Sequence, residues 1–464
     1  MIKKLWIYIR YWLFNWFKML WMGLKHGPFD MIRDLKKYPW MLSLIKANTL
    51  LLKLVSKRTP RYAEANAMVI SEVVSSIIKQ LEGVFYDKDK MILHEDMVPP
   101  EIFRAMGLST WMIEFNGILM PLVEPRSMEQ YIDISENEGV PPDICSLPKS
   151  SMGFALKGHL PEALAMVTSN LPCDGGMAAY TLIEKKLNIP VFRLDIPYNF
   201  YNERAVEYFS NELKQMIAWL EQHTPGRMNW DRLREICEER NRMAEAELEL
   251  WDLIRTKPAP MAAEPIYLSH LWGFNLAPGQ KIATRLFEKI GELAKLNLKE
   301  GLQAVANEKY RALLWNPPTL HFIDLFAWAE KAYGVSLLMD SMSYNRQPFI
   351  DTKTPDSMLK GLSNIIMQGP MARHTRGPSE NYFNDMFHIY KHFNLDMIWI
   401  AGHIGCKNTQ ALNGILREKC RESKIPLLII DYDLSDTRIV GRDGIIAQVE
   451  QFMENIMKAK RLDK

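Results

Sequence analysis

The sequence has few of the features that mark exported or nucleic-acid-binding proteins. Its 464 residues include only five cysteines, an odd number, and no cleavable signal peptide is evident. Extracellular disulfides would need an exporting segment, so we expect a cytoplasmic protein with reduced thiols. The lysine and arginine residues, 57 in all, nearly balance the 55 aspartate and glutamate residues, so we expect no nucleic-acid partner.

Phosphate loops and long apolar runs are also missing. No glycine-rich loop of the Walker or Rossmann type is present, so we do not expect this chain to bind ATP itself. In the aromatic N-terminal segment, the longest uncharged run is Tyr11 to Phe17, far short of the roughly 20 apolar residues of a spanning helix. The length and the apolar fraction of 48% do allow two or three domains with large cores.

The first 27 residues combine aromatic, aliphatic and basic side chains in an unusual segment. At about 100° per residue, its lysine and arginine residues fall within about 120° of a helix that is otherwise largely apolar; they are Lys3, Lys4, Arg10, Lys18 and Lys25. Such a helix is typical of membrane interfaces and would place the protein peripherally on the inner face of a membrane. Docking on a partner subunit, or on the core of this chain, explains the pattern at least as well.

Alternating strand and helix patterns predict an α/β protein with two related parallel-sheet domains, flavodoxin-like or Rossmann-like. The predicted strand Glu162 to Ser169 leads through a helix into the strand Val191 to Ile196. In the same way, Leu395 to Ala401 leads into Leu427 to Tyr432. We expect an amphipathic helix at 1–27, a helical region at 28–88, a first α/β domain at 89–204, a helical connecting region at 205–305 and a second α/β domain at 306–460.

Three cysteines, Cys145, Cys173 and Cys406, stand where a buried strand is expected to end, each beside glycine, proline or aspartate. Their wide separation differs from that of a zinc ribbon or a thioredoxin-type pair. It suits three loops that converge on one soft metal centre, because thiolates favour iron–sulfur clusters, zinc or copper(I). The alternative is that these are ordinary buried cysteines. We favour that alternative for Cys237 and Cys420, which lie inside predicted amphipathic helices.

Acid–base side chains are found at other predicted strand ends. The sequence His94-Glu95-Asp96 ends the first predicted strand and Glu114 follows the second, so His94, Glu95 and Glu114 are candidate catalytic groups. His403, three residues before Cys406, is a candidate neighbour of the metal centre or proton donor. A polar strand end or a structural histidine explains these residues as readily.

Taken together, these motifs show that the chain resembles the 2-hydroxyacyl-CoA dehydratase and benzoyl-CoA reductase family of anaerobic iron–sulfur enzymes. The resemblance runs from about Met91 to Ile456 and does not include the N-terminal helix. The segments that carry it are Asp143-Ile144-Cys145, Asn170-Leu171-Pro172-Cys173, Asn188-Ile189-Pro190, Asp195-Ile196-Pro197-Tyr198-Asn199, Asn241-Arg242, Lys257-Pro258-Ala259-Pro260, Gly405-Cys406-Lys407 and Asp433-Leu434-Ser435-Asp436-Thr437-Arg438.

The resemblance implies that Cys145, Cys173 and Cys406 hold one [4Fe-4S] cluster, with one iron left open for a CoA thioester substrate. It implies a related second cluster-bearing subunit and a separate ATP-dependent iron–sulfur activator protein that supplies one electron. The implied activity is that of a lyase: the reduced 2-hydroxyacyl-CoA becomes a ketyl radical, which eliminates water.

Two other functions remain open, one within the same family and one of a different class. One is an oxidoreductase of the benzoyl-CoA reductase type, which reduces an aromatic or unsaturated acyl-CoA; the other is a non-catalytic electron-relay subunit. Several dehydratases carry small hydroxyl residues where this chain has Leu93-His94-Glu95. The segment Glu308-Lys309-Tyr310-Arg311 and the Pro317-Pro318 pair resemble the reductase branch at least as much.

Overall fold

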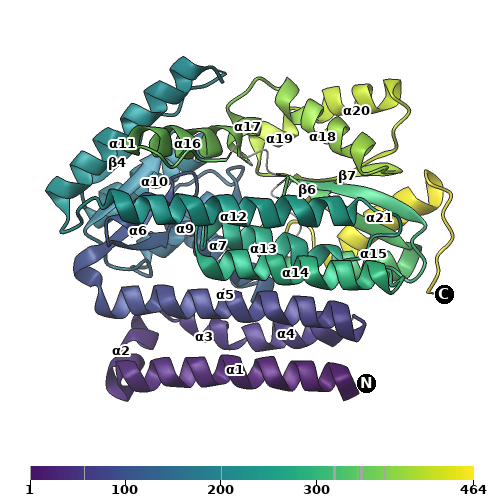
Figure 1. The fold of residues 1–464 in the computed structure, drawn as a ribbon, viewed down its shortest axis with the longest axis horizontal. Coiled ribbons are helices and arrows are strands. Elements are labelled where there is room, and N and C mark those ends of the chain that lie inside the picture. The colour runs from purple at the N-terminus through teal and green to yellow at the C-terminus, as the bar shows by residue number, and fades with distance from the viewer. Residues whose placement is uncertain are drawn as a thin grey trace.

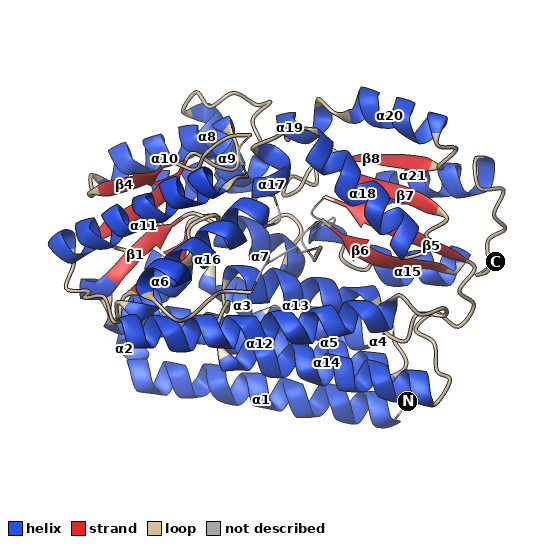
Figure 2. Ribbon diagram, turned by 45° about the horizontal axis from the view of Figure 1, so that its top comes forward, coloured by secondary structure: helices blue, strands red, loops and turns tan. Residues whose placement is uncertain are grey.

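The protein consists of two parallel sheets that lie side by side against layers of long helices (Figures 1 and 2). The computed structural model describes residues 2–56, 58–199, 201–316, 320–341, 343–344, 349–369 and 371–463. The Pro317-Pro318 pair therefore lies outside the described residues.

The first sheet is built from four short parallel strands, β1 (Met91–His94), β2 (Ser109–Met112), β3 (Ala165–Ser169) and β4 (Val191–Leu194). Their spatial order is β2-β1-β3-β4. Every residue of β1 and β3 is buried. This is why these strands read as continuous apolar runs, since helices cover both faces of a parallel sheet.

The second sheet repeats this arrangement with β5 (Tyr310–Trp315), β6 (Val335–Asp340), β7 (Met397–His403) and β8 (Leu427–Tyr432). Its order is β6-β5-β7-β8, again all parallel. In each sheet the chain therefore forms a central strand first and then a neighbour at one edge. The third and fourth strands follow on the other side of the first strand. The predicted α/β class with two parallel sheets is confirmed.

Helices connect the strands of both sheets, and one further helix follows the last strand. Those of the first sheet are α6 (Pro100–Ala105), α7 (Phe115–Val123), α8 (Glu129–Asn137), α9 (Ser146–Leu156) and α10 (Asp174–Leu187). Those of the second are α15 (Leu325–Tyr333), α16 (Pro355–Gln368), α17 (Ala372–Thr375), α18 (Glu380–His392), α19 (Lys407–Gln410), α20 (Asn413–Glu422) and α21 (Arg442–Asn455).

Longer helices form the remaining layers. The two sheets are joined by α11 (Glu203–His223), α12 (Trp230–Ile254), α13 (Ala263–Asn275) and α14 (Lys281–Lys299). The N-terminal region contains α1 (Ile2–His26), α2 (Pro28–Lys37), α3 (Met41–Ile45), α4 (Ala47–Ser56) and α5 (Pro60–Tyr86). Figure 1 shows α12, α14, α5 and α1 nearly parallel, with α1 at the outer edge and packed on α5.

One expectation about the cysteines is wrong. Cys145 does not end a strand, because the chain between β2 and β3 is helical and Cys145 lies in the turn between α8 and α9. The preceding Pro141-Pro142 pair has no N–H groups to donate to a strand ladder. Cys173 and Cys406 do follow β3 and β7, as expected.

Among the described residues, no helix is both long and apolar enough to cross a membrane. This includes α1, whose basic residues interrupt its apolar sequence. Since α1 packs on α5, the question that remains is what the outward face of α1 contacts.

Candidate active site

Three half-buried cysteines from separate loops each precede a helix. Cys145 is the residue before α9, Cys173 the residue before α10, and Cys406 the residue before α19. All five cysteines are free thiols, but Cys237 and Cys420 are buried inside α12 and α20, as expected. The three loop cysteines are thus the more accessible thiols of the chain.

The Cys406 loop is fixed against the other two cysteine loops. A Cβ atom added to Gly405 would lie 2.7 Å from the Cys145 Cα atom, so these two backbones touch. Lys407 forms an ion pair with Asp143 at 3.0 Å, next to the same contact. On the other side, the Asn408 side-chain amide donates to the Pro172 carbonyl at 3.4 Å. Loops that are far apart in the sequence therefore form one structure.

The three thiols are electrostatic neighbours. Burial raises the pKa of the Cys145 and Cys173 thiols, and the Cys406 thiol raises the pKa of both further. Backbone N–H groups of Leu147 at Cys145, and of Gly175 and Gly176 at Cys173, act in the opposite direction and lower the pKa. Such donors stabilise thiolate sulfur or another anionic group placed between the loops.

His403, at the end of β7, contributes a further donor. Its Nδ1 atom accepts the backbone N–H of Leu434 at 3.1 Å, and its Nε2 atom lies 3.0 Å from the Cys145 sulfur. Burial lowers the pKa of His403, which favours the neutral ring. A neutral ring that accepts at Nδ1 carries its proton at Nε2, so His403 donates to the Cys145 sulfur.

Two predicted catalytic residues, Glu95 and Glu114, meet beside the strand ends of the first sheet. Their side chains are 0% and 5% exposed. Burial, with smaller effects of Asp96 and Glu114, raises the pKa of Glu95 well above its usual range. Burial, with a smaller effect of Asp96, raises the pKa of Glu114 to about 8. Carboxyl groups in this environment hold protons at neutral pH.

Hydrogen bonds link these acidic groups to one another. The Glu95 and Asp96 side chains hydrogen-bond to each other, which requires a proton on one of them. The Tyr180 hydroxyl hydrogen-bonds to Glu114. Among the described atoms, no donor reaches Glu95 Oε1, Asp96 Oδ1 or Glu114 Oε2. The group therefore has both protons to give and oxygens free to accept them.

This acid cluster, consisting of Glu95, Asp96, Glu114 and Tyr180, lies next to the cysteine loops. Asp96 raises the pKa of the Cys173 thiol. A Cβ atom on Gly176, in the first turn of α10, would lie 3.2 Å from the Tyr180 hydroxyl. Sequence analysis missed Tyr180, although its position two turns after Cys173 on one helix could have indicated it.

The ring of His94, the third predicted catalytic residue at these strand ends, has structural contacts. Its Nδ1 atom lies 2.8 Å from the Glu95 carbonyl oxygen, and its ring packs on Phe103 at 5.5 Å between centroids. Burial lowers the pKa of His94 to about 4, so the ring is neutral and Nδ1 donates to the carbonyl. These contacts fix the turn that presents Glu95.

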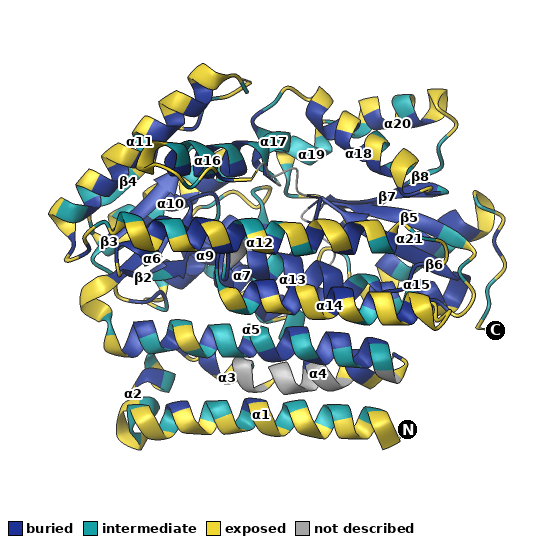
Figure 3. Cartoon of the chain, in the orientation of Figure 1, coloured by how far each residue is buried: buried dark blue, intermediate teal, exposed yellow. Residues whose placement is uncertain are grey.

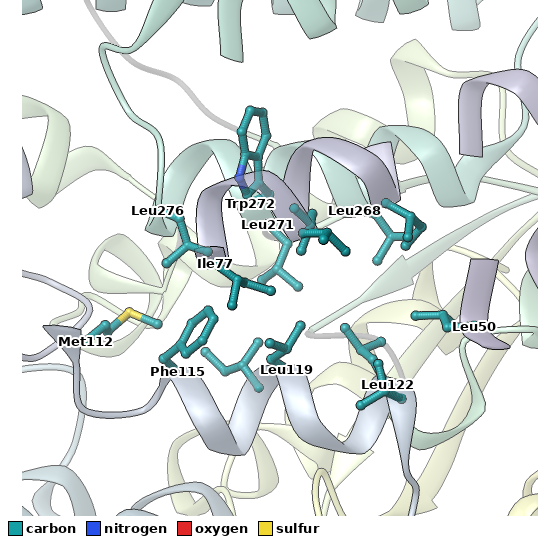
Figure 4. Close-up of a pocket in the computed structure, with 15 residues that line it drawn as sticks. Leu50, Ile77, Met112, Phe115, Leu119, Leu122, Leu268, Leu271, Trp272 and Leu276 are labelled. Atoms are coloured by element: carbon teal, nitrogen blue, oxygen red, sulfur yellow. The ribbon is translucent and has the colours of Figure 1, made fainter. Parts of the chain in front are cut away.

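An apolar cavity of about 60 Å³ lies between α5, α7 and α13 (Figure 4). Ile77, Leu119 and Trp272 are among its walls, and none of the described residues that line it is titratable. It offers nothing for acid–base chemistry, so the cysteine loops and the acid cluster remain the candidate site.

The donor set fits a soft, anionic group that is larger than a single ion. Among the described residues, no three His, Cys, Asp or Glu side chains are grouped as ligands of one metal ion. The three loops nevertheless present three soft sulfur atoms. They add N–H donors from Leu147, Gly175, Gly176 and His403.

Comparison with known proteins shows one family and several distant relatives. Residues 97–456 match the family described as 2-hydroxyglutaryl-CoA dehydratase, D-component. The alpha subunit of (R)-2-hydroxyglutaryl-CoA dehydratase from Acidaminococcus fermentans is 29% identical over 143 residues, which is 30% of each chain. The alpha subunit of (R)-phenyllactyl-CoA dehydratase from Clostridium sporogenes is 22% identical over 343 residues, 70% of this chain and 80% of the relative.

A third relative, lactoyl-CoA dehydratase subunit alpha from Anaerotignum propionicum, is 20% identical over 241 residues, 47% of this chain and 56% of the relative. The matches thus span 30% and 56% of the length of two of these relatives. The family match contains all three loop cysteines and Glu114, and it begins after α5.

Proposed function

Because this chain belongs to the 2-hydroxyglutaryl-CoA dehydratase, D-component family, we propose that it is a subunit of a 2-hydroxyacyl-CoA dehydratase-type lyase. The family expected from the sequence is thereby confirmed. In our proposal, Cys145, Cys173 and Cys406 hold a [4Fe-4S] cluster, and the substrate is a 2-hydroxyacyl-CoA. The relatives are named as alpha subunits, so we include a related second subunit and an ATP-dependent activator protein as partners.

The observation that supports this proposal most directly is the convergence of the three cysteine loops. Gly405 brings Cys406 against Cys145, Asn408 ties the same loop to Pro172, and each thiol precedes a helix. A set of purely structural cysteines would not need loops from both sheets to meet with all three residues only half-buried.

When bound, the cluster would supply a low-potential electron and an open iron that acts as a Lewis acid. The residues of the chain handle protons around it. Elimination of water needs a group that gives a proton to the departing hydroxyl. Glu114, protonated at neutral pH and bonded to Tyr180, can give that proton. Glu95 and Asp96, which share a proton, can take one up and pass it on.

The metal content of anaerobically purified protein tests the proposal. We expect about four iron atoms and four sulfide ions per chain in the wild type. Cys173→Ala should lose most of both, because one of three ligands is missing. Cys420→Ala, which removes a buried thiol of α20, is the matched control and should keep them. A well-folded wild type that takes up no iron after anaerobic reconstitution would refute the cluster assignment.

A second prediction concerns the donor at Cys145. His403→Ala should retain the cluster but lower its midpoint potential, because a hydrogen bond to a ligating sulfur stabilises the reduced, more negative state. Redox titration followed by electron paramagnetic resonance measures this shift. His403→Gln, which keeps a side-chain N–H, should restore part of it. Equal potentials in all three proteins would show that the Nε2 proton does not face the cluster.

A further inference from the structure

Helix α1 is apolar on two opposite faces, of which one is packed and the other open to solvent (Figure 3). At about 100° per residue, the six most exposed apolar side chains fall within an arc of about 100°. We call this the outer face; its residues, each at least 60% exposed, are Ile2, Trp6, Phe17, Leu20, Trp21 and Leu24. A single exposed leucine needs no explanation, but a continuous face of this kind indicates a contact surface.

The opposite face holds α1 in a defined orientation. Asn15 is fully buried and accepts a hydrogen bond from the Ser71 hydroxyl of α5 at 3.0 Å. Near the end of the helix, Lys25 forms an ion pair with Glu82 at 3.0 Å. A buried polar pair fixes the rotation of the helix, because any turn about its axis would leave the amide without its partner. The packing of α1 on α5 therefore leaves the outer face exposed to solvent.

The charge around the outer face is mainly positive. The sequence contains no aspartate or glutamate before Asp30. Beside α1, a hollow of about 390 Å³ lies between α1, α5 and α14, and Arg10, Arg285 and Lys289 line it together with Glu72. Among the described residues, none of these three basic side chains is in an ion pair. The hollow is thus suited to an anionic group.

The outer face fits a lipid surface better than a protein. Protein interfaces carry about one hydrogen bond per 100–200 Å², whereas the six outer-face residues offer only the two indole N–H groups of Trp6 and Trp21. The other polar groups within the same arc are the exposed cations Lys3 and Arg10, which suit anionic headgroups. A bilayer interface asks for no such bonds and favours tryptophan beside lysine and arginine. A second hollow, apolar and of about 190 Å³, opens between Leu20 and Leu42 and extends the apolar surface.

We propose that α1 lies in the plane of an anionic bilayer, with its outer face at the acyl-chain boundary and the hollow of Arg10, Arg285 and Lys289 facing lipid phosphates. This assignment is independent of the catalytic proposal, because the family match begins after α5. This proposal explains why α1 has more apolar surface than its packing against the rest of the chain buries.

Vesicle co-sedimentation of the full-length chain tests the apolar part. We expect binding to phosphatidylcholine vesicles that contain about 30% phosphatidylglycerol and much weaker binding to phosphatidylcholine alone. Replacing three outer-face residues should weaken binding about tenfold or more; the variant is Trp6→Gln/Phe17→Gln/Trp21→Gln. A control replaces three exposed apolar residues elsewhere, Leu248→Gln/Ile415→Gln/Ile456→Gln, and should bind like wild type.

The basic part has its own variant. Arg10→Gln/Arg285→Gln should weaken binding to anionic vesicles by about fivefold per charge and leave binding to neutral vesicles unchanged. All variants should keep the wild-type melting temperature, since the replaced side chains lie outside the core. Absent binding to anionic vesicles, or equal binding by the outer-face variant, would overturn the proposal. So would self-association that the outer-face variant abolishes without any lipid binding, which would make this face an interface between copies.

Discussion

Gly405→Ala should fail to hold the proposed iron–sulfur cluster although every cysteine remains in place. The added Cβ would lie 2.7 Å from Cys145 Cα and 3.1 Å from its backbone nitrogen. Both are main-chain atoms, so no side-chain rotation can relieve the clash, and one cysteine loop must move away from the other. The φ angle of Gly405 is not in the left-handed region, so alanine meets no backbone strain there. Any loss of iron in this variant would therefore result from the separation of the two loops and not from backbone strain at residue 405.

Iron and sulfide per chain measure this result, and the melting temperature reports on folding. Gly414→Ala is the matched control, because a Cβ there meets nothing within 4 Å and the residue lies in α20 of the same segment. We expect Gly414→Ala to keep full iron and to gain up to about 1 kcal/mol of stability from helix propensity. Full iron in Gly405→Ala would show that the loops can separate without harm to the site.

Glu114→Gln should lower the turnover of the assembled, activated enzyme by about 10²- to 10⁴-fold. Glutamine has nearly the same shape and can still accept the Tyr180 hydrogen bond, but it holds no transferable proton. Iron content should not change. Glu184→Gln in α10, which replaces a half-exposed carboxylate paired with Arg193, is the matched control and should turn over like wild type. Wild-type turnover in Glu114→Gln would exclude Glu114 as the proton donor.

The proposed role of Glu114 as proton donor also predicts how turnover depends on pH. Burial raises the pKa of Glu114 to about 8, so a donor role predicts turnover that falls as the pH rises through 8, and the variant should lack that decline. The folded state binds the Glu114 proton more tightly than the unfolded state, so the contribution of Glu114 to stability decreases as the pH rises from 4.5 to about 8. The melting temperature of Glu114→Gln should therefore decline less than that of wild type over this range.

Sequence patterns predicted the sheets well because parallel strands in this fold are short and buried on both faces. The strand Leu427 to Tyr432 is found at its predicted bounds, and other strands shift by a few residues. The position of Cys145 was predicted wrongly because the connection between β2 and β3 is helical. No local sequence pattern shows that the turn containing Cys145 contacts the Gly405 loop of the second sheet.

Other features of the site depend on tertiary contacts. Glu95 and Glu114 could be singled out from their positions after predicted strands, but the removal of water that raises their pKa values comes from packing. The basic arc of α1 was visible in the sequence, whereas the orientation of the helix was not. The structure turns Lys18 inward toward Ser75 of α5 and leaves the aromatic face outward.

The matching strand orders of the two sheets have a consequence for symmetry. Two equivalent halves supply equivalent residues only in pairs, and Cys173 after β3 and Cys406 after β7 are such a pair. Cys145 has no counterpart, since the sequence between β6 and β7 contains no cysteine. The two halves thus place one thiol each at equivalent positions, and the third thiol has no equivalent, so the three together do not follow the repeat of the sheets. The side of the site formed by the Cys145 turn therefore differs from the sides formed by the two sheet loops, so a ligand held between the three thiols meets unlike surroundings on each side.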